Sequence, residues 1–528
     1  MTYKYSNDDK ANFKWFQNDH TRQSLRSIEL TEGSLRGLYP FRADFQFPIT
    51  AIAGSNGSGK STLLALAACA YHNHKAGYKS AGRKFPYHTF SDFFVQSNDE
   101  LPPQGIVIKY GLSHNSWKSS DPGVHYQSRK KKVGGKWNDY DKRINRNVAY
   151  FGVTRVVPHF ERSAHKSNRS RFKSIGLNDD VSKKIALIAG RIIGKKYDNF
   201  ESQEHLKYSL PRVSSNGFEY TGFNMGAGES AVFEILTTLF TIGTGALLII
   251  DEIELGLHER AQYRFIEELK QVCLNNKCQI ICSTHSFAIL SSLPPEARIF
   301  IEASKKTTTL ITGISPEFAC GKMGGKDAHE LDIFVEDLVA KKMLEEWLPS
   351  SLRKRIKISS IGSHAAVIKV LATRYLEKRN NCFCILDGDQ RSRSSSALKS
   401  MIGHTEASGD AEKGKAESWA TERITYLPGN MPPEKWLIAV LEEKAKLNEG
   451  GIVGTLMSTW GIDSKQQFDD SLNAALQADA HSEFFTLAEE IYSDKDTVLT
   501  DIIRAIKLLA PEDVEEILEF TTSFFDNF

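Results

Sequence analysis

The run GSNGSGKS at residues 54–61 constrains the fold more than any other part of the sequence. It fits the pattern GxxxxGK[ST] and lies between an apolar stretch, ITAIA, and a helical run, TLLALAACAYH. A glycine-rich turn between a strand and a helix lets backbone N–H groups surround phosphates, and the helix N-terminus adds partial positive charge. The sequence therefore predicts a parallel α/β sheet with a phosphate-binding loop at one strand end.

Two side chains of this loop have distinct expected roles. Lys60 would reach the β- and γ-phosphates of ATP, and the Ser61 hydroxyl would bind Mg²⁺. The backbone and side chains around them would complete the nucleotide-binding set. The other expected members of that set are Gly54, Ser55, Asn56, Gly57, Ser58, Gly59 and Thr62.

Two later strands carry the acids and the histidine that ATP hydrolysis needs. Asp251 ends the apolar run ALLII and would hold Mg²⁺, and Glu252 would polarise the attacking water as a general base. His285 follows the next apolar run, QIICST, and could contact the γ-phosphate. A histidine at a strand end often has no catalytic role, but the spacing from Asp251 favours the phosphate-sensing role.

A further motif, NMGAGES at residues 224–230, opens a predicted helix just before the acidic strand. It resembles the signature segment of ABC-type ATPases, which closes over the γ-phosphate of the opposite subunit. Gly226 replaces the usual serine, so backbone N–H groups at Gly226 and Gly228, and the first helical turn with Glu229, would make the contact. Residues 254–258 (ELGLH) stand where the D-loop of such ATPases belongs.

The resemblance to ABC-type ATPases implies that two heads complete each ATP site. A homodimer or a higher oligomer that assembles through these heads therefore follows. Gln96 is the candidate for the Q-loop glutamine, and a role as an ordinary surface residue is an equal alternative.

After residue 330 a second α/β pattern begins, and acidic residues follow two of its strands. Glu336 comes after DIFV, and Asp387 and Asp389 come after NCFCIL. Carboxylates at the ends of parallel strands suit octahedral Mg²⁺ or Mn²⁺, and Glu336 would be a ligand or a general acid/base. Glu434 precedes a later helix and would either bind a second metal ion or stabilise the helix N-terminus.

Together these motifs resemble the OLD (overcoming lysogenisation defect) nucleases, which join an ABC-type ATPase head to a C-terminal TOPRIM domain. The resemblance implies a DNA endonuclease that uses ATP and a divalent metal ion. Similar proteins serve in bacterial anti-phage defence, some beside a retron reverse transcriptase. Ala340 stands where such nucleases often carry a second acid, and Asp337 replaces a glycine. This departure favours the alternative, a non-nuclease ATPase sensor or DNA-repair clamp with a vestigial TOPRIM domain.

Changes in pattern divide the chain into three parts. A Gly- and Lys-rich stretch at 316–329 predicts a linker, and the polar stretch at 390–418 predicts a mobile loop. The expected domains are an ATPase head at 1–315 with an inserted basic, dimerising lobe at about 100–220, a TOPRIM domain at 330–445 and a helical region at 446–528.

Local charge, rather than the net charge of +2, carries the expectation of a nucleic-acid partner. Residues 126–146 hold many Lys and Arg with interleaved aromatics, and residues 155–173 form a second basic stretch. Such runs suit phosphate contacts and base stacking on DNA, RNA or a retron RNA–DNA hybrid. The alternative is a pair of solvated basic loops.

The sequence also predicts a compartment. Its N-terminus lacks an apolar signal-peptide core, and its apolar runs are shorter than the roughly 20 residues that cross a bilayer. Its 7 cysteines are dispersed, which suits a reducing environment. We therefore expect a cytoplasmic protein without a membrane partner.

Overall fold

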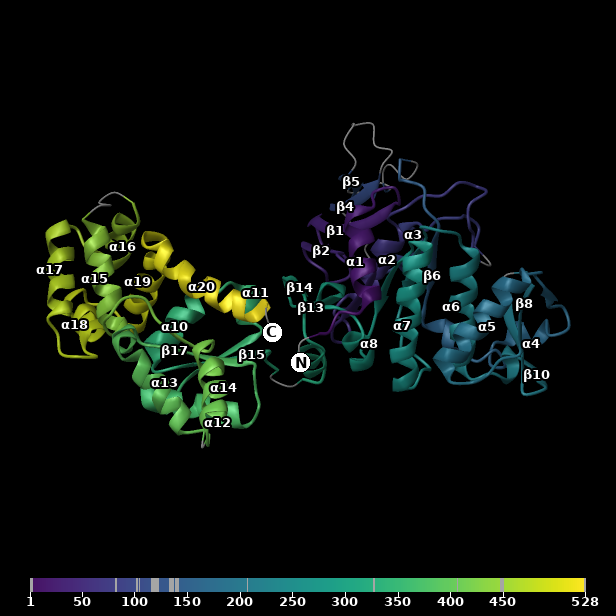
Figure 1. Cartoon of the computed structure of the whole chain (residues 1–528). Helices are drawn as coiled ribbons and strands as arrows, with labels where there is room; N and C mark the ends of the chain where they lie inside the picture. Colours follow the sequence, from purple (N-terminus) through teal and green to yellow (C-terminus); the bar gives the residue numbers. More distant parts are fainter. Residues whose placement is uncertain are drawn as a thin grey trace. The chain divides into compact units, whose positions relative to one another are not determined.

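A computed structural model describes residues 3–80, 83–100, 103, 105–114, 123–132, 137, 142–206, 208–325, 328–405, 407–446 and 451–526. The chain divides into two compact units, Tyr3–Asp327 and Ala328–Phe528 (Figure 1). Each unit is built around its own parallel sheet and is described by itself below.

The N-terminal unit is centred on a six-stranded sheet in the order β14-β13-β3-β12-β11-β6. Five strands are parallel, and β14 pairs antiparallel at one edge. Three of its inner strands, Ile49–Ala53, Leu247–Ile250 and Gln279–Ser283, are mainly apolar and are buried along their whole length, as a sheet covered on both faces requires. The strands are β3 (Ile49–Ala53), β6 (Val148–Phe151), β11 (Leu247–Ile250), β12 (Gln279–Ser283), β13 (Arg298–Ala303) and β14 (Thr308–Thr312).

Helix α2 (Lys60–Ala68) lies between this sheet and a second, antiparallel one. Nearly all of its residues are buried, because it contacts β11 and β12 on one side and β1 on the other. A helix that is apolar all round is stable only in such an interior position. The second sheet has the order β2-β1-β4-β5, with strands β1 (Ser24–Glu32), β2 (Phe41–Asp44), β4 (Ile106–His114) and β5 (Gly123–Lys131).

The segment at about 100–220 differs from the single inserted lobe that the sequence predicts. Its strands β4 and β5 belong to the antiparallel sheet, and its strand β6 forms the edge of the main sheet. The part that follows forms a third sheet in the order β10-β9-β8-β7. Those strands are β7 (Lys173–Ser174), β8 (Asn199–His205), β9 (Tyr208–Ser215) and β10 (Phe218–Thr221).

Helices surround the main sheet of this unit, and α7 contacts both α1 and α5 (Figure 1). The expected linker at 316–329 begins with a helix, α9, because Phe318 packs edge-on against Phe300 of the main sheet. The remaining helices are α1 (Asn7–Asn18), α3 (Phe90–Phe93), α4 (Ser163–Ser167), α5 (Asp179–Ile193), α6 (Ala227–Thr241), α7 (Glu259–Asn276), α8 (Phe287–Ser291) and α9 (Pro316–Met323), with 3-10 turns η1 (Val153–Val156), η2 (Gly222–Asn224) and η3 (Pro295–Ala297).

The C-terminal unit contains a four-stranded, fully parallel sheet in the order β16-β15-β17-β18. Alternate residues of β17 enter two different cores, because successive side chains of a strand point to opposite faces. Phe383 and Ile385 join one core, and Cys382 and Cys384 join the other. The strands are β15 (Leu331–Val335), β16 (Ile356–Ser360), β17 (Cys382–Leu386) and β18 (Ile424–Tyr426).

Helices cover both faces of this sheet. The segment 390–418, expected as a mobile loop, instead contains the end of η4, all of α13 and most of α14, because Met401 of α13 and Ala420 of α14 are buried against the sheet. Helices α10 and α15–α20 share the other core with strands β15, β16 and β17, and α10 contacts β16 directly. The elements are α10 (Leu338–Trp347), α11 (Ser350–Arg353), α12 (His364–Leu376), η4 (Gly388–Arg393), α13 (Ser394–Gly403), α14 (Asp410–Thr421), α15 (Pro433–Ala445), α16 (Ile452–Trp460), α17 (Lys465–Leu476), α18 (Glu483–Glu490), α19 (Lys495–Leu509) and α20 (Pro511–Asp526).

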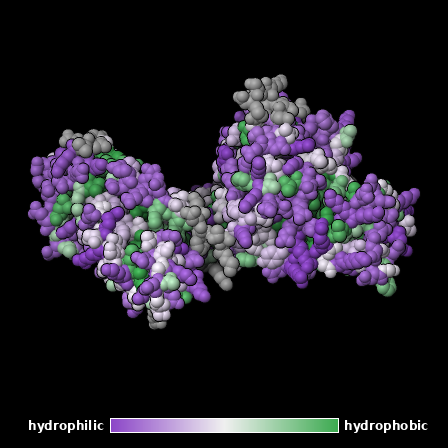
Figure 2. Space-filling view, viewed as in Figure 1, coloured by the Kyte–Doolittle hydropathy of each residue, from purple (hydrophilic) through white to green (hydrophobic). Residues whose placement is uncertain are grey.

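The face of the molecule in Figure 2 is covered mainly by hydrophilic residues, and the hydrophobic ones form small separate groups. In the part of the chain that the structure describes, no helix is long and apolar enough to span a bilayer.

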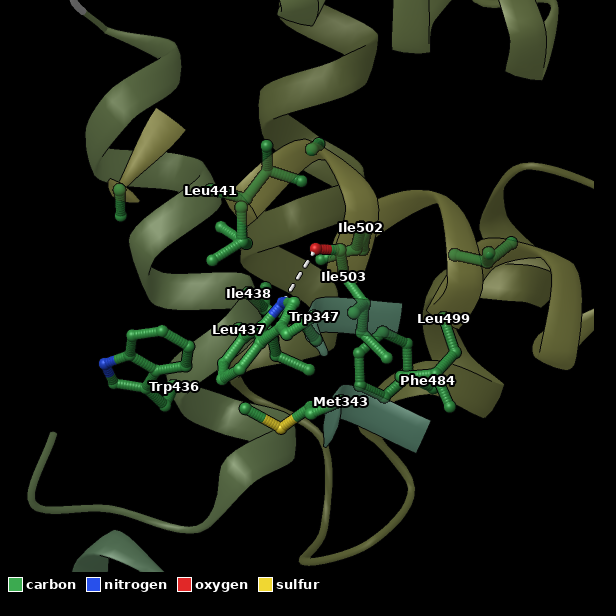
Figure 3. Close-up of a cluster of buried hydrophobic side chains, with 14 of the residues drawn as sticks. Met343, Trp347, Trp436, Leu437, Ile438, Leu441, Phe484, Leu499, Ile502 and Ile503 are labelled. Carbon is green, nitrogen blue, oxygen red and sulfur yellow. Dashed lines mark hydrogen bonds between the residues drawn. The ribbon is translucent and has the colours of Figure 1, made fainter. Parts of the chain in front are cut away.

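Trp347 anchors the C-terminal helices to the sheet. Its side chain is fully buried, and its indole N–H donates a hydrogen bond of 3.2 Å to the carbonyl of Ile503 in α19 (Figure 3). Trp436 packs edge-on against it with ring centroids 6.1 Å apart. Trp347 therefore holds α10, α15 and α19 in one core.

We predict that Trp347→Ala lowers the free energy of unfolding of the C-terminal unit by about 3–5 kcal/mol, because it leaves a large cavity. Denaturant unfolding of the full chain measures this effect. Tyr492→Ala is the matched control, since Tyr492 is an aromatic residue of the same unit and 97% exposed. Equal stability of the two variants would contradict the anchoring role.

Candidate functional site

The loop between β3 and α2 has a backbone that requires glycine. Gly57 and Gly59 adopt φ angles of 78° and 99°, in the region that L-residues with a side chain rarely enter. A β-carbon at Gly59 would also lie 2.3 Å from the side chain of Leu38. The loop thus requires glycine at Gly59, which the phosphate-loop pattern specifies, and also at Gly57, which it does not.

Lys60 begins α2, and its side chain is buried. Its ammonium group donates hydrogen bonds to the carbonyls of Gly54 (2.7 Å) and Ser55 (3.1 Å). Burial lowers the pKa of Lys60, while the nearby charges of Glu252 and Asp251 act to raise it. The lysine therefore lies at the mouth of the loop, close to the two acids expected to take part in hydrolysis.

The other residues of the loop divide into exposed and buried side chains. Ser55, Asn56 and Ser61 are exposed, so a phosphate or its magnesium ion can reach them. Ser58 is buried, and its hydroxyl has no hydrogen-bond partner among the described residues. Thr62 is buried in the first turn of α2. A polar loop of this kind fits the phosphates of a nucleotide.

Asp251 and Glu252 follow β11, and the neighbouring strand β12 fixes their position. The Ser283 hydroxyl donates a hydrogen bond of 2.5 Å to Asp251 Oδ1 and accepts one of 2.7 Å from the Glu252 N–H. Glu252 has a φ angle of 51°, which is unusual for a residue with a side chain. Ser283 thus stabilises the bend that turns Glu252 out of the strand direction.

His285 lies beside the expected catalytic base. Its Nε2 atom is 3.4 Å from Glu252 Oε1. Glu254 orients this segment, since its carboxylate accepts hydrogen bonds from the His285 N–H (2.6 Å) and from the Thr284 hydroxyl (2.8 Å). The sequence spacing therefore does bring the histidine to the acidic pair, and its role in sensing phosphate stays a prediction.

Sequence reasoning missed the most direct partner of the acidic pair, Arg155. Its guanidinium donates hydrogen bonds to the carbonyls of Asp251 (2.6 Å) and Glu252 (2.5 Å), and its side chain is 4% exposed. By composition, Arg155 belongs to the basic stretch at 155–173 that is expected to contact nucleic acid. The structure corrects this assignment, because the guanidinium is buried and bonded to backbone carbonyls, which keeps it away from phosphates at the protein surface. The position of Arg155 directly after the edge strand β6 is the one signal that the sequence offered.

The NMGAGES segment forms the start of α6, with Gly226 as the residue that caps the helix. A β-carbon at Gly228 would lie 1.9 Å from the carbonyl oxygen of Gly256, so only glycine allows α6 to approach the ELGLH segment this closely. Gly226 is exposed and leaves the helix N-terminus accessible. The pairing of Gly228 with Gly256 is a requirement that sequence reasoning missed.

Glu229, in the same segment, is held inside its own subunit. One carboxylate oxygen accepts hydrogen bonds of 2.6 Å from the hydroxyls of both Tyr197 and Tyr220, and Lys195 lies 3.6 Å away. The expected contact of this segment with a nucleotide therefore depends on Gly226, Gly228 and the helix N-terminus. Gln96, the candidate Q-loop residue, is half-buried and donates a hydrogen bond to the nearby Phe94 carbonyl.

A second group of acids lies at the carboxyl edge of the sheet in the C-terminal unit. Glu336 follows β15 and Asp387 follows the adjacent strand β17, and the Asp387 N–H donates a hydrogen bond of 2.9 Å to Glu336 Oε1. Burial raises the pKa of Asp387 to about 8, and the charges of Glu336, Asp337, Asp389 and Glu434 add to this effect. Burial also raises the pKa of Glu336. The structure thus gathers the predicted acids into one carboxylate cluster.

The residue between Asp387 and Asp389 must be a glycine for steric reasons. A β-carbon at Gly388 would lie 2.8 Å from the carbonyl oxygens of Pro428 and Gly429. This close approach brings the loop after β18 against the DGD turn. The same loop leads into α15, which carries Glu434, so the glycine permits the acids of two strands and a helix to converge.

Two members of the cluster have buried oxygens without partners. Asp387 Oδ1 and Glu434 Oε2 lack a hydrogen bond to any described residue. The other oxygen of Glu434 lies 3.1 Å from Nδ1 of His481, and this contact raises the pKa of His481.

Asp337 caps α10 by accepting a hydrogen bond of 2.8 Å from the N–H of Ala340. The side chain of Ala340 is completely buried.

A divalent cation fits this cluster in charge and in ligand type. Buried carboxylates that raise one another's pKa favour a positive ion between them, and hard oxygen ligands suit Mg²⁺ or Mn²⁺. Within the described ranges, no three His, Cys, Asp or Glu side chains are arranged as ready ligands of one ion. The metal-binding roles of Glu336, Asp387, Asp389 and Glu434 therefore stay predictions.

The basic run at 126–146 is partly internal, which corrects its reading as a uniform nucleic-acid surface. Arg143 donates hydrogen bonds to the carbonyls of Cys69 (2.9 Å) and His88 (2.8 Å), and Arg146 is likewise buried. The Trp137 ring stacks on a neighbouring phenylalanine with centroids 3.8 Å apart. Residues 133–136 and 138–141 lie outside the described residues. The exposed basic side chains among the described residues of the two runs are Lys130, Lys132, Lys142, Lys166, Arg169, Arg171 and Lys173.

Comparisons with known proteins agree with an ATPase. A family model described as "AAA domain, putative AbiEii toxin, Type IV TA system" matches residues 111–291, which include the acidic strand β11 and β12. A search of curated proteins finds no match. The geometry of the loop and this match define the N-terminal unit as a P-loop ATPase-type domain.

Three SMC head structures are among the matches to solved structures. The SMC head domain from Thermotoga maritima is 15% identical, with 55% of this chain and 98% of that chain covered and a TM-score of 0.34. The SmcHead bound to the C-winged helix domain of ScpA is 15% identical, with 55% of this chain and 98% of that chain covered and a TM-score of 0.35. The third structure, derived from Pyrococcus furiosus, is an Smc head domain with an extended coiled coil bound to the C-terminal domain of ScpA. It is 12% identical, with 57% of this chain and 99% of that chain covered and a TM-score of 0.34.

We predict that Glu252→Gln slows ATP turnover by roughly two orders of magnitude or more and leaves ATP binding intact, because the amide cannot accept a proton from water. Phosphate release and equilibrium ATP binding measure the two effects. Glu259→Gln, an exposed residue at the start of α7, is the control. Unchanged hydrolysis in Glu252→Gln would mean that another group is the base.

The pKa of Asp387 predicts a pH-dependent stability. An ordinary Asp has a pKa of about 3.9, so between about pH 4 and pH 8 folded Asp387 keeps a proton that the unfolded chain releases. Stability therefore falls as pH rises through this window. We predict that Asp387→Asn, measured with EDTA by denaturant unfolding, gains roughly 1–3 kcal/mol over the wild type between pH 5 and pH 8. Asp463→Asn, an exposed site, is the control, and parallel pH profiles for all three proteins would contradict the prediction.

Proposed function

We propose that this protein is a DNA endonuclease of the OLD type that uses ATP and a divalent metal ion. The observation that carries the proposal is the carboxylate cluster of the C-terminal unit, on a chain whose other unit is a P-loop ATPase domain. Asp387 is the centre of this cluster, with a pKa raised to about 8 by burial and by the surrounding acids. A hydrolase that cuts phosphodiesters with a metal ion needs such a concentration of carboxylates.

In the N-terminal unit, the glycine loop and Lys60 would bind the phosphates of ATP. Asp251 and Ser61 would hold Mg²⁺, which neutralises the phosphate charge when bound. Glu252 would accept a proton from the attacking water, with His285 beside it at 3.4 Å. The bend that Ser283 and Arg155 stabilise orients Glu252 for this task.

We infer a homodimer or higher oligomer in which two heads complete each ATP site. The exposed N-terminus of α6 supports this inference, because its N–H groups are free of a side-chain cap. Gly226 would bring these groups to the γ-phosphate on the opposite head. Glu229 is held by two tyrosines and would act by keeping α6 in place rather than by touching the nucleotide.

In the C-terminal unit, Glu336, Asp387, Asp389 and Glu434 would hold Mg²⁺ or Mn²⁺. The bound ion would supply charge neutralisation at the scissile phosphate and a water of lowered pKa. The raised pKa of Asp387 implies that full ionisation of the cluster and metal binding occur together. The exposed Lys and Arg side chains of the two basic runs would contact the phosphates of DNA, of RNA or of a hybrid of both.

An anti-phage defence effector in the cytoplasm is the context that we propose. The AbiEii toxin description of the matching family model is in keeping with such a role. A reverse transcriptase or another protein of a defence operon would be its partner. ATP binding or hydrolysis would then act as the switch that permits cleavage.

A second candidate is a non-nuclease ATPase sensor or DNA-repair clamp with a vestigial TOPRIM domain. Ala340 favours it, because this residue replaces an acid and is completely buried. In this alternative Asp337 acts only as the cap of α10, which it provides through the hydrogen bond to the Ala340 N–H.

Cleavage of supercoiled and linear DNA, with Mg²⁺ or Mn²⁺ and with or without ATP, separates the two candidates. We predict metal-dependent nicking or cutting that Asp387→Asn reduces by roughly a hundredfold or more, because the cluster loses a charged ligand. Asp463→Asn is the matched control. Equal cleavage by Asp387→Asn and the wild type would overturn the site assignment. No cleavage with either metal would favour the sensor.

A further inference from the structure

The N-terminal unit contains a large cleft that neither proposed active site uses. Its volume is about 1220 Å³, and its walls come from helix α6, from β6 and the segment after it, and from the sheet β10-β9-β8-β7. Pockets for small ligands commonly measure about 300–1,000 Å³. The cleft is therefore large enough for a molecule of two nucleotide units.

The described residues that line the cleft carry more positive than negative charge. Its two histidines add none at neutral pH, because burial lowers the pKa of His159 to about 3 and that of His165 to about 4. An anion is therefore the favoured type of ligand. The positively charged lining residues are Lys79, Arg83, Lys84, Arg155 and Arg162, and the negatively charged ones are Glu204 and Glu234.

Aromatic rings provide the second element of recognition. Tyr78, Tyr150 and Tyr208 are half-buried members of the lining. Phe200 and Phe233 also line the cleft, and their rings are stacked with centroids 4.8 Å apart. Planar bases stack on such rings, while Lys and Arg side chains bind phosphates. Positive charge together with aromatic faces fits a nucleotide better than a simple inorganic anion.

One wall of the cleft is bonded directly to the ATP site. Arg155 lines the cleft, and its guanidinium holds the backbone carbonyls of Asp251 and Glu252. Glu234 of α6 also lines the cleft near these groups. Burial raises its pKa, and the charges of Arg162 and Arg155 act to lower it. An anion that attracts Arg155 would compete with these carbonyls for the guanidinium.

A second wall is bonded to the start of α6, which carries the signature-like segment. Nε2 of His159 lies 2.9 Å from the Ser230 hydroxyl in the first turn of that helix. Nδ1 of His159 lies 2.7 Å from Nδ1 of His165, which also lines the cleft. A ligand that moves either histidine would therefore also affect the helix that approaches a partner's ATP.

We propose that this cleft is an effector site for a dinucleotide-sized anion whose occupancy changes the rate of ATP hydrolysis. The exposed Lys79 and Lys84 bind its phosphates, and its bases lie against the tyrosines. Arg155 and the His159–Ser230 contact transmit occupancy to the two halves of the ATP site. The site depends on the ATPase head alone and stands whether or not the C-terminal unit cuts DNA.

Binding is tested by calorimetry with three linear 5′-phosphorylated dinucleotides, pApA, pGpG and pUpU. The full chain carries Lys60→Ala, so that the phosphate loop does not bind the probes. We expect at least one dinucleotide to bind, and the added pair Lys79→Glu and Lys84→Glu to weaken its binding by about tenfold or more.

The matched control is the pair Lys305→Glu and Lys306→Glu, which reverses the same charge at exposed positions of the same unit. Its affinity should stay within about twofold of the Lys60→Ala parent. Binding of none of the three dinucleotides would overturn the site. Equal losses in the two double variants would also overturn it, since they would indicate a general charge effect.

Coupling is tested by ATP hydrolysis in chains with an intact Lys60. A saturating amount of the dinucleotide that binds should change the rate at least about twofold in the wild type and in the Lys305/Lys306 control. The Lys79/Lys84 variant should show no such response at the same concentration. An unchanged wild-type rate at saturation would contradict the coupling between the cleft and the ATP site.

Discussion

The parallel pairing of β3, β12 and β11 is the constraint on which the N-terminal unit depends. Carboxyl ends of parallel strands meet at one edge of a sheet, so the phosphate loop, the Ser283–His285 segment and the acidic pair come together there. The central strand β12 makes the connection, because Ser283 bonds to both Asp251 and Glu252. Arg155, which follows the edge strand β6, fixes the same pair from the other side.

The C-terminal unit applies the same geometry to a different set of side chains. Its parallel strands β15 and β17 are followed by Glu336 and Asp387, and the hydrogen bond from the Asp387 N–H to the Glu336 carboxylate holds the two residues in contact. Here the edge brings several acids close to one another. Burial and the charges of these acids together raise the pKa of Asp387, and a bound cation is the simplest way to relieve this repulsion.

Much of this arrangement could be predicted from local sequence patterns. The glycine loop, the apolar strands and the acids at their ends are short-range signals, and the strand order brings His285 beside Glu252 as its spacing indicated. Contacts between distant segments could not be predicted in this way. Gly228 against Gly256 and Arg155 against Asp251 depend on the tertiary packing of strands and helices that no local pattern specifies.

The basic runs also show that local sequence does not predict tertiary contacts. Composition counted every Lys and Arg at 126–146 and 155–173 as potential surface charge. In the structure Arg143, Arg146 and Arg155 are buried and bonded to backbone carbonyls. An arginine that satisfies carbonyls at a strand end cannot be told from a phosphate-binding one by sequence, because both occur in polar segments next to strands.

The central claim, that the edge of the main sheet is an ATP site, is tested most directly by equilibrium binding of ATP with Mg²⁺ to the full chain. The account predicts saturable binding that Lys60→Ala weakens by roughly tenfold or more, because the loop loses its phosphate-facing charge. Lys10→Ala, at an exposed position of α1, should bind ATP like the wild type. Undiminished ATP binding by Lys60→Ala would contradict the account.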